Sequence, residues 1–323
     1  MSETEPLIVA RNLRKSFPIG AGKFFGRPTG AVAAVDDVSF DIRRGETLGL
    51  VGESGCGKST TGRVLMRLIE PDSGSIHFDG TDLTALGRTG LNVERKRLQL
   101  VFQDSSSAFN PRKRVGWIIA EPMRLAGMSR QDRRNRVAEL LPLVGLRPEY
   151  GERFPHQFSG GQRQRIGIAR ALALQPELIV CDEPVSALDV SIQAQVVNLL
   201  KGLQDQFGLT YLFISHDLRV VRHLADRVAV MYLGRIVEIG TTDELYRHPR
   251  HPYTQMLLQA VPRISTDKPQ HTTAVVGEAV LQTASLGCKF APRCPRATAT
   301  CRAEAPTLVS GSPGHSVACF YPN

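Results

Sequence analysis

The chain has 323 residues, of which 42% are hydrophobic and 22% are charged, and this balance excludes an intrinsically disordered protein. Its formal net charge of +9 allows nucleic acid, a nucleotide phosphate or an anionic membrane surface as partner, without choosing among them. No apolar stretch approaches the roughly 18 residues of a spanning helix, and the acidic start carries no export signal, so we expect a cytosolic chain whose six Cys form no disulfides.

Strand and helix patterns alternate in the first part of the chain, which is typical of an α/β fold with a mostly parallel sheet. A buried strand over 47–51 leads through a Gly-rich turn into a helix at about 58–69. Further strands are predicted over 75–79 and 98–102. The segment from about 110 to 158 is helical in pattern and is punctuated by Pro, which predicts an inserted helical subdomain.

The same alternation resumes after this segment. It predicts a strand over 178–181, an amphipathic helix over 192–207, a strand over 210–214 and a hairpin over 227–237. Beyond these elements the chain becomes polar and Thr-rich, as linkers are, and then short and loop-like with four Cys. We therefore expect a folded domain, a linker and a Cys-rich segment at 1–262, 263–286 and 287–323.

A Gly-rich segment between the first buried strand and its helix has the spacing G-x-x-x-x-G-K-[ST] of a phosphate-binding loop. It consists of Gly52, Glu53, Ser54, Gly55, Cys56, Gly57, Lys58, Ser59 and Thr60. Glycines let successive backbone N–H groups face one point at a helix N-terminus, where a phosphate is favoured. Lys58 is expected to reach the β- and γ-phosphates and Ser59 to bind Mg²⁺. An ordinary Gly-rich turn is the alternative, and the flanking strand and helix disfavour it.

Two carboxylates end the predicted strand over 178–181. Asp182 is expected to hold Mg²⁺ through water beside Ser59, and Glu183 to accept a proton from the water that attacks the γ-phosphate. A solvated strand end is the alternative, and the phosphate loop upstream disfavours it. Cys181 lies within the strand and is expected to pack in the core.

The segment Phe158-Ser159-Gly160-Gly161-Gln162 could be no more than a helix start capped by Ser159. Between the phosphate loop and Asp182, however, it resembles the signature motif of ABC-type ATPases, with Phe in place of the usual Leu. Four further residues fall in the order of that family. Phe17 resembles the aromatic residue under adenine, Gln103 the Q-loop, Asp189 the end of the D-loop and His216 the switch histidine.

This resemblance implies an ABC-type P-loop nucleotide-binding domain with an α-helical subdomain. It implies that ATP and Mg²⁺ bind, with Ser59, Gln103 and Asp182 around the metal. It also implies that Lys58, Gln103, Glu183 and His216 take part in hydrolysis. The residues Ser159, Gly160, Gly161, Gln162 and Asp189 are then expected to close over ATP bound to a second such domain, so that two domains form a head-to-tail dimer.

Longer segments resemble one family in particular. The stretches 49–61, 155–166 and 181–194 and the sequence His251-Pro252-Tyr253-Thr254 look like the F-type ATPase subunit of bacterial oligopeptide and dipeptide importers. This resemblance implies a homologous D-type ATPase as partner, two membrane permeases, an indirect link to a peptide-binding protein, no nucleic acid, and a peripheral place on the cytoplasmic face of the inner membrane. We expect Gln103 and the region 110–117 to couple ATP to the permeases. Residues 103–110 depart from the family pattern, which affects docking and leaves the ATPase chemistry intact.

Four Cys close to several Pro mark the C-terminal segment, which has too few apolar residues for a core of its own. They are Cys288, Cys294, Cys301 and Cys319. Their spacing differs from the paired C-x2-C of zinc ribbons. The resemblance implies that they bind a [4Fe–4S] cluster, so that the segment is a small metal-binding extension; zinc and unligated thiols are the alternatives.

Other functions fit less of the sequence. An ABC ATPase acting on nucleic acid would agree with the positive charge, but such chains carry two nucleotide-binding domains or a long coiled-coil insert, and no heptad run lies between Lys58 and Asp182. An importer for nickel or glutathione would share the same ATPase motifs. A metal-sensing module with a vestigial phosphate loop is disfavoured because Glu183, His216 and the signature segment are intact.

Overall fold

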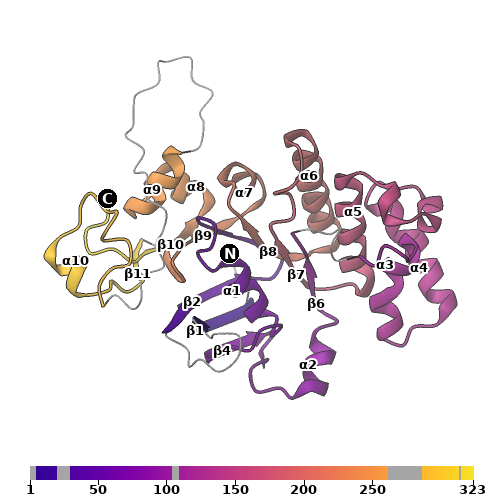
Figure 1. Ribbon diagram of the computed structural model, residues 1–323, viewed down its shortest axis with the longest axis horizontal. Coiled ribbons are helices and arrows are strands. Elements are labelled where there is room, and N and C mark those ends of the chain that lie inside the picture. Colours follow the sequence, from indigo (N-terminus) through magenta and orange to yellow (C-terminus); the bar gives the residue numbers. More distant parts are fainter. Residues whose placement is uncertain (1–4, 20–29, 104–108, 261–285, 313) are drawn as a thin grey trace, which may run out of the picture. The chain divides into compact units, whose positions relative to one another are not determined.

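The computed structural model of the chain describes residues 5–19, 30–103, 109–260, 286–312 and 314–323 (Figure 1). These residues form two compact units, each made of separate stretches of sequence. Of the described residues, the first unit comprises those within Met1–Val9, Asp41–Gly49 and Ile76–Ala225, and the second those within Ala10–Phe40, Leu50–Ser75 and Asp226–Asn323. Four strands have residues in both units: β1 (Pro6–Ile19), β2 (Gly30–Arg43), β3 (Thr47–Val51) and β4 (Ser73–Phe78).

Three parallel strands form the centre of the first unit: β6 (Leu98–Val101), β7 (Leu178–Asp182) and β8 (Thr210–Ser215). All residues of β7 and β8 are buried, as expected for apolar strands covered on both faces. Val101 pairs with Cys181, and Asp182 pairs with Ile214. Because the strands are parallel, their carboxyl ends lie at one edge, so the residues that follow β6, β7 and β8 are brought to the same place.

The first unit also contains several helices. The longer ones are α3 (Val115–Leu125), α4 (Arg130–Leu143), α5 (Gly160–Ala171) and α6 (Val190–Phe207). The shorter elements are β5 (Thr81–Asp82), α2 (Arg88–Glu94), η1 (Pro148–Glu152), η2 (Pro155–Gln157), η3 (Leu172–Leu174) and α7 (Leu218–Leu224). The segment expected to be helical thus contains α3, α4 and two short 3₁₀ turns, and Figure 1 shows α3, α4 and α5 gathered together.

The second unit contains an antiparallel sheet in the order β9, β10, β12, β11. Its strands are β9 (Arg227–Tyr232), β10 (Arg235–Thr241), β11 (Val309–Ser312) and β12 (His315–Val317), and its helices are α1 (Lys58–Leu65), α8 (Thr242–Arg247), α9 (Pro252–Gln259) and α10 (Ala299–Ala303). The β9–β10 hairpin expected from the sequence is present, with Gly234 at φ 86° in its turn.

The C-terminal segment differs from the loop-like piece that the sequence suggests. Its strand β12 pairs with β10, and Figure 1 shows this yellow part of the chain beside β10. The carboxylate of Glu238 is fully buried on β10 and accepts hydrogen bonds from the backbone N–H groups of Arg250 and His251 at 2.7 and 3.0 Å. Its oxygen Oε1 also lies 2.7 Å from Nε2 of His315. Pairing with β10 and the contact with Glu238 therefore stabilise the C-terminal segment.

Candidate functional site

The phosphate loop follows β3 and ends at α1, in the second unit. Gly52 and Gly57 have φ of 154° and 107°, and both are packed against backbone. A side-chain carbon added at Gly52 would lie 2.2 Å from the carbonyl oxygen of Met231, and one at Gly57 would lie 1.9 Å from that of Ala34. Only glycine fits at these two points, which explains the glycines of the motif by close approach as well as by conformation.

Lys58 is the first residue of α1, and its side chain turns back over the loop. The residue is 4% exposed, and Nζ donates hydrogen bonds to the carbonyl oxygens of Gly52 and Glu53 at 2.8 and 2.9 Å. A buried ammonium at a helix N-terminus is a strong attraction for phosphate. Ser59 and Thr60 occupy the first turn of the same helix.

Glu183 stands at the carboxyl edge of the parallel strands, in the first unit. It has a positive φ of 45°, held by a hydrogen bond from its N–H to the carbonyl of Ile214 at 3.0 Å. Its oxygen Oε2 lies 3.2 Å from Nε2 of Gln103 and 3.3 Å from Nδ1 of His216. Strained backbone of this kind persists where the surrounding structure fixes it, often at functional sites. Asp182, directly before it, is 2% exposed.

The structure thus brings together three of the residues singled out in the sequence, from three separate segments. Gln103 follows β6, Glu183 follows β7 and His216 follows β8. A carboxylate that is flanked by an amide N–H and an imidazole can orient a water molecule and take up its proton. The expected pairing of Ser59 with Asp182 around Mg²⁺ stays a prediction, because the two residues belong to different units.

The signature segment forms the start of α5 through a reciprocal capping box. The Ser159 hydroxyl accepts a hydrogen bond from the N–H of Gln162 at 3.3 Å, and the Gln162 side chain accepts one from the N–H of Ser159 at 3.0 Å. A side-chain carbon at Gly161 would lie 2.4 Å from Cγ2 of Ile192, so α6 requires glycine there. Ser159 and Gly160 remain exposed, which leaves this helix N-terminus open to an anion.

The departure at Phe158 has a structural reason. Its ring is 5% exposed and packs edge-on against Tyr150, with 5.5 Å between the ring centroids.

Two further residues named from the family resemblance are exposed. Asp189 is exposed at the start of α6. Phe17 lies on β1 with 40% of its surface exposed, and Nζ of Lys15 is 5.8 Å from its ring centroid. An exposed aromatic face of this kind is free to stack on a base.

The four C-terminal Cys border one small cavity of about 20 Å³, which His251 and Phe290 also line. The chain holds them close by short turns, since the N–H of Cys288 donates to the carbonyl of Cys301 at 2.8 Å. Among the described residues, however, no group of three or more His, Cys, Asp or Glu side chains is arranged to hold a metal ion. A metal-binding extension is therefore not supported by this arrangement.

Glu53 has two partners that the sequence did not indicate. Arg293 binds its carboxylate, and the hydroxyl of Tyr253 accepts a hydrogen bond from its N–H at 2.9 Å. Tyr253 lies within a segment that the resemblance singled out, but without a role. Arg293 stands beside Cys294, and no pattern distinguishes it from the other arginines of the chain.

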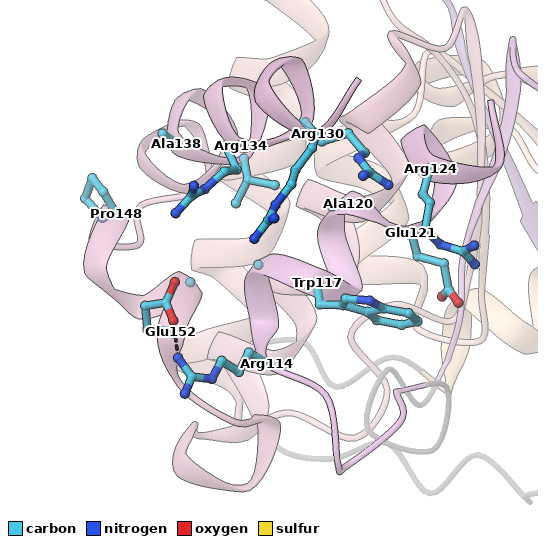
Figure 2. Close-up of a pocket in the computed structure, with 14 residues that line it drawn as sticks. Arg114, Trp117, Ala120, Glu121, Arg124, Arg130, Arg134, Ala138, Pro148 and Glu152 are labelled. Carbon is cyan, nitrogen blue, oxygen red and sulfur yellow. Dashed lines mark hydrogen bonds and ion pairs between the residues drawn. The ribbon is translucent and has the colours of Figure 1, made fainter. Parts of the chain in front are cut away.

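A second cavity, of about 600 Å³, lies among α3, α4 and η1 in the first unit (Figure 2). Figure 2 shows Trp117 and Arg114 on one side and Arg130 and Arg134 of α4 on the other. Trp117 is 37% exposed, and its ring centroid lies 4.8 Å from Nζ of Lys113. The charged residues that line this cavity are Arg114, Arg124, Arg130, Arg133, Arg134, Glu121 and Glu152. The cavity is strongly basic and includes the end of the region expected to contact the permeases. Residues 104–108, where the sequence departs from the family pattern, lie outside the described residues.

Similarity to known proteins covers nearly the whole chain. A profile of the family described as "ABC transporter" matches residues 35–186, and one described as "Oligopeptide/dipeptide transporter, C-terminal region" matches residues 237–301. The oligopeptide transport ATP-binding protein AppF of Bacillus subtilis is 51% identical over 98% of this chain and 97% of its own. The dipeptide transport ATP-binding proteins DppF of Haemophilus influenzae and Escherichia coli are 47% and 46% identical, over 99% and 98% of this chain and 98% and 94% of their own.

Solved structures agree with these relatives. A dimeric post-hydrolysis state of the ATP-binding cassette MJ0796, bound to ADP and phosphate, superimposes with a TM-score of 0.64 at 28% identity, covering 73% of this chain and 98% of that one. The protein cbiO1 of Clostridium perfringens, part of the ABC transporter complex cbiONQ, gives 0.65 at 26% identity, covering 75% and 91%. The mixed α/β fold is thus that of an ABC cassette. Within the part of the chain that the structure describes, no helix is both long and apolar enough to cross a membrane.

Proposed function

Because this chain belongs to the family of ABC transporter ATP-binding proteins of oligopeptide and dipeptide transport, we propose that it is the ATPase subunit that energises peptide import. It converts ATP and water into ADP and phosphate. The observation that carries the hydrolysis is the contact of Glu183 with both Gln103 and His216. The cargo is inferred from the relatives, which are named as oligopeptide and dipeptide transport proteins and match this chain along almost their entire length.

The chain's own residues account for each step of the reaction. The phosphate loop and Lys58 bind the β- and γ-phosphates, and on binding the phosphate oxygens replace the carbonyls that now accept from Nζ. Ser59, Asp182 and Gln103 would hold Mg²⁺, which would neutralise phosphate charge when bound. Glu183 takes a proton from the attacking water, while His216 holds the carboxylate in place.

A second ATPase domain completes the site. The exposed N-terminus of α5, with Ser159 and Gly161, offers backbone N–H groups to ATP bound on the partner, and Asp189 is exposed at the start of α6. We propose a homologous D-type subunit as this partner. Nucleotide then closes the dimer, and hydrolysis opens it. Expression of this chain with and without the D-type subunit tests the proposed pairing, since an active homodimer of this chain alone would contradict it.

Two permeases are the proposed membrane partners, and they would hold the chain at the cytoplasmic face of the inner membrane. The basic cavity around Trp117 supports a contact with an acidic permease segment, because five arginines there face two glutamates. A peptide-binding protein acts on the permeases from outside. Charge reversal at Arg130 and Arg134 should release the chain from membranes that contain both permeases, and unchanged retention would contradict this docking surface.

We also propose that the C-terminal segment binds a [4Fe–4S] cluster through Cys288, Cys294, Cys301 and Cys319. Its support is that four thiols border one cavity, which is the donor set such clusters use. A cluster of this kind would cross-link α10, which carries Cys301, with the turns and loop that carry the other three Cys. Protein purified without oxygen should be brown, with absorbance near 400 nm and about four irons per chain. Cys294→Ser should lose the colour and Cys181→Ala should keep it, whereas colourless protein would overturn the proposal.

The decisive test of peptide import uses the complete transporter in lipid nanodiscs. Peptide together with its binding protein should raise the rate of phosphate release several-fold, and Glu183→Gln in this chain should abolish the increase. Stimulation by nucleic acid instead, or by nickel or glutathione with no effect of peptide, would contradict the proposal.

A further inference from the structure

The carboxylate of Glu53, in the phosphate loop, binds an arginine of the C-terminal segment. Nη1 and Nη2 of Arg293 donate to Oε2 and Oε1 of Glu53 at 2.8 and 2.9 Å. The two side chains are 13% and 29% exposed. Such a two-pronged contact fixes geometry as well as charge, because both planar groups must align. The hydrogen bonds to Glu53 raise the pKa of Arg293 above its ordinary value.

The backbone of Glu53 is held from the same direction. Its N–H donates to the hydroxyl of Tyr253, whose side chain is fully buried. The Tyr253 ring lies 4.6 Å from that of Tyr232 and 5.5 Å from that of Phe290, measured between centroids. Phe290 belongs to the C-terminal segment and lines the cavity of the four Cys. The ring cluster thus ties the segment to the loop by packing, independently of the Arg293 contact.

A second connection runs through the β9–β10 turn. The N–H of Gly234 donates to the carbonyl of Cys56 in the phosphate loop at 2.8 Å. The neighbouring carbonyl of Leu233 accepts a hydrogen bond from Nζ of Lys289 at 2.7 Å, and the same ammonium lies 2.9 Å from Asp36. The C-terminal segment is therefore connected to the phosphate loop at two points. It contacts Glu53 directly, and it reaches Cys56 through the β9–β10 turn.

The position of Glu53 matters for the phosphates. Its carbonyl accepts from Nζ of Lys58, so its backbone helps to set where that ammonium lies. Its carboxylate is a negative charge within the loop that must receive a polyphosphate, and a free carboxylate there would repel ATP. Arg293 neutralises this charge and holds the carboxylate in place.

We propose that Arg293 is a positioning residue for ATP, and that through it the C-terminal segment controls how well the phosphate loop binds nucleotide. The proposal rests on the proposed ATPase function. It gives the segment a role in the ATP site without any contact between its Cys and the nucleotide. Loss of order around the four Cys would then weaken ATP binding by releasing Glu53.

The test compares charge variants in the complete transporter. Arg293→Gln leaves the Glu53 carboxylate unpaired and should raise the KM for ATP by about tenfold, with kcat within about threefold of the wild type. Glu53→Gln removes the offending charge, so the double variant Glu53→Gln with Arg293→Gln should return the KM most of the way to the wild-type value. A residue that merely supports the fold would not be rescued in this way.

Arg296→Gln is the matched control, because Arg296 lies in the same segment but binds Asn323. It should leave the KM unchanged. An unchanged KM in Arg293→Gln, no rescue in the double variant, or an equal rise in Arg296→Gln would each overturn the proposal. Failure of the ATPase function itself is distinguishable, since Lys58→Ala would then hydrolyse ATP at the wild-type rate.

Discussion

Replacement of Glu183 tests the assigned chemistry most directly. In Glu183→Gln the side chain keeps its length, and one oxygen can still face Gln103 or His216 at the observed 3.2 and 3.3 Å. What disappears is the negative charge that takes up the proton of water. General-base catalysis contributes about 10²- to 10⁴-fold, so turnover should fall by that factor, which corresponds to about 3 to 5 kcal/mol in the activation free energy.

A second substitution separates charge from position. Glu183→Asp keeps the carboxylate but withdraws it by roughly one carbon–carbon bond, or about 1.5 Å. Misplacement of a catalytic group by about 1 Å can cost about 10²-fold. Glu183→Asp should therefore be slow as well, although less so than the amide, because a carboxylate remains. If position were irrelevant, the Asp variant would match the wild type.

The assay is phosphate release by the purified transporter with saturating ATP, alongside retention of labelled nucleotide on a filter. Glu183→Gln should retain nucleotide at wild-type affinity while its turnover collapses. Glu149→Gln serves as the control, because Glu149 is an exposed carboxylate on η1, and it should behave as the wild type. Turnover within about threefold of the wild type in Glu183→Gln would refute the role given to this residue.

Three further outcomes are expected. Lys58→Ala should lose nucleotide binding, because the ammonium over the loop disappears; a wild-type dissociation constant would contradict this. Gly57→Ala should lower the free energy of unfolding by at least about 3 kcal/mol in denaturant titrations, since the added carbon would lie 1.9 Å from a carbonyl oxygen, whereas Gly55→Ala, which meets nothing within 4 Å, should cost only about 1 kcal/mol of backbone strain. Burial lowers the pKa of His251 to about 4, below its ordinary 6.5, so the folded state favours the neutral ring and stability that is complete above pH 6.5 should fall by about 3 kcal/mol as the pH drops to 4. His251→Asn keeps an acceptor for the N–H of Tyr253 but does not titrate, so an equal pH dependence in this variant would count against that reading.

Short elements that have a characteristic local sequence pattern could be predicted from the sequence. The strand over 47–51 and the hairpin turn at Gly234 lie where the pattern indicates. The two long strands β1 and β2 were not identified. Their alternation of buried and exposed residues is broken where Asn12 and Asp37 adopt positive φ of 49° and 62°, and such irregularities hide a strand from a period of two.

The candidate site divides in the same way. Glu183 and His216 could be named in advance because each follows an apolar strand and both fit one family order. The partner of Glu53 could not, because 240 positions separate it from Arg293 and no local pattern connects the two charges. Likewise, the four Cys drew attention to the C-terminal segment as a metal site, while the pairing of its three-residue strand β12 with β10 carried no detectable signal.

The pairing of β12 with β10 makes the order of synthesis matter. When translation has produced β10, the strand that covers its edge has not yet left the ribosome, since it begins only at His315. Until then the edge is bare and the Glu238 carboxylate lacks its imidazole partner. A message cut short before His315 would yield a chain with an open strand edge, which is the kind of surface that seeds aggregation. A chain that lacks β12 should therefore aggregate more readily than one that carries it.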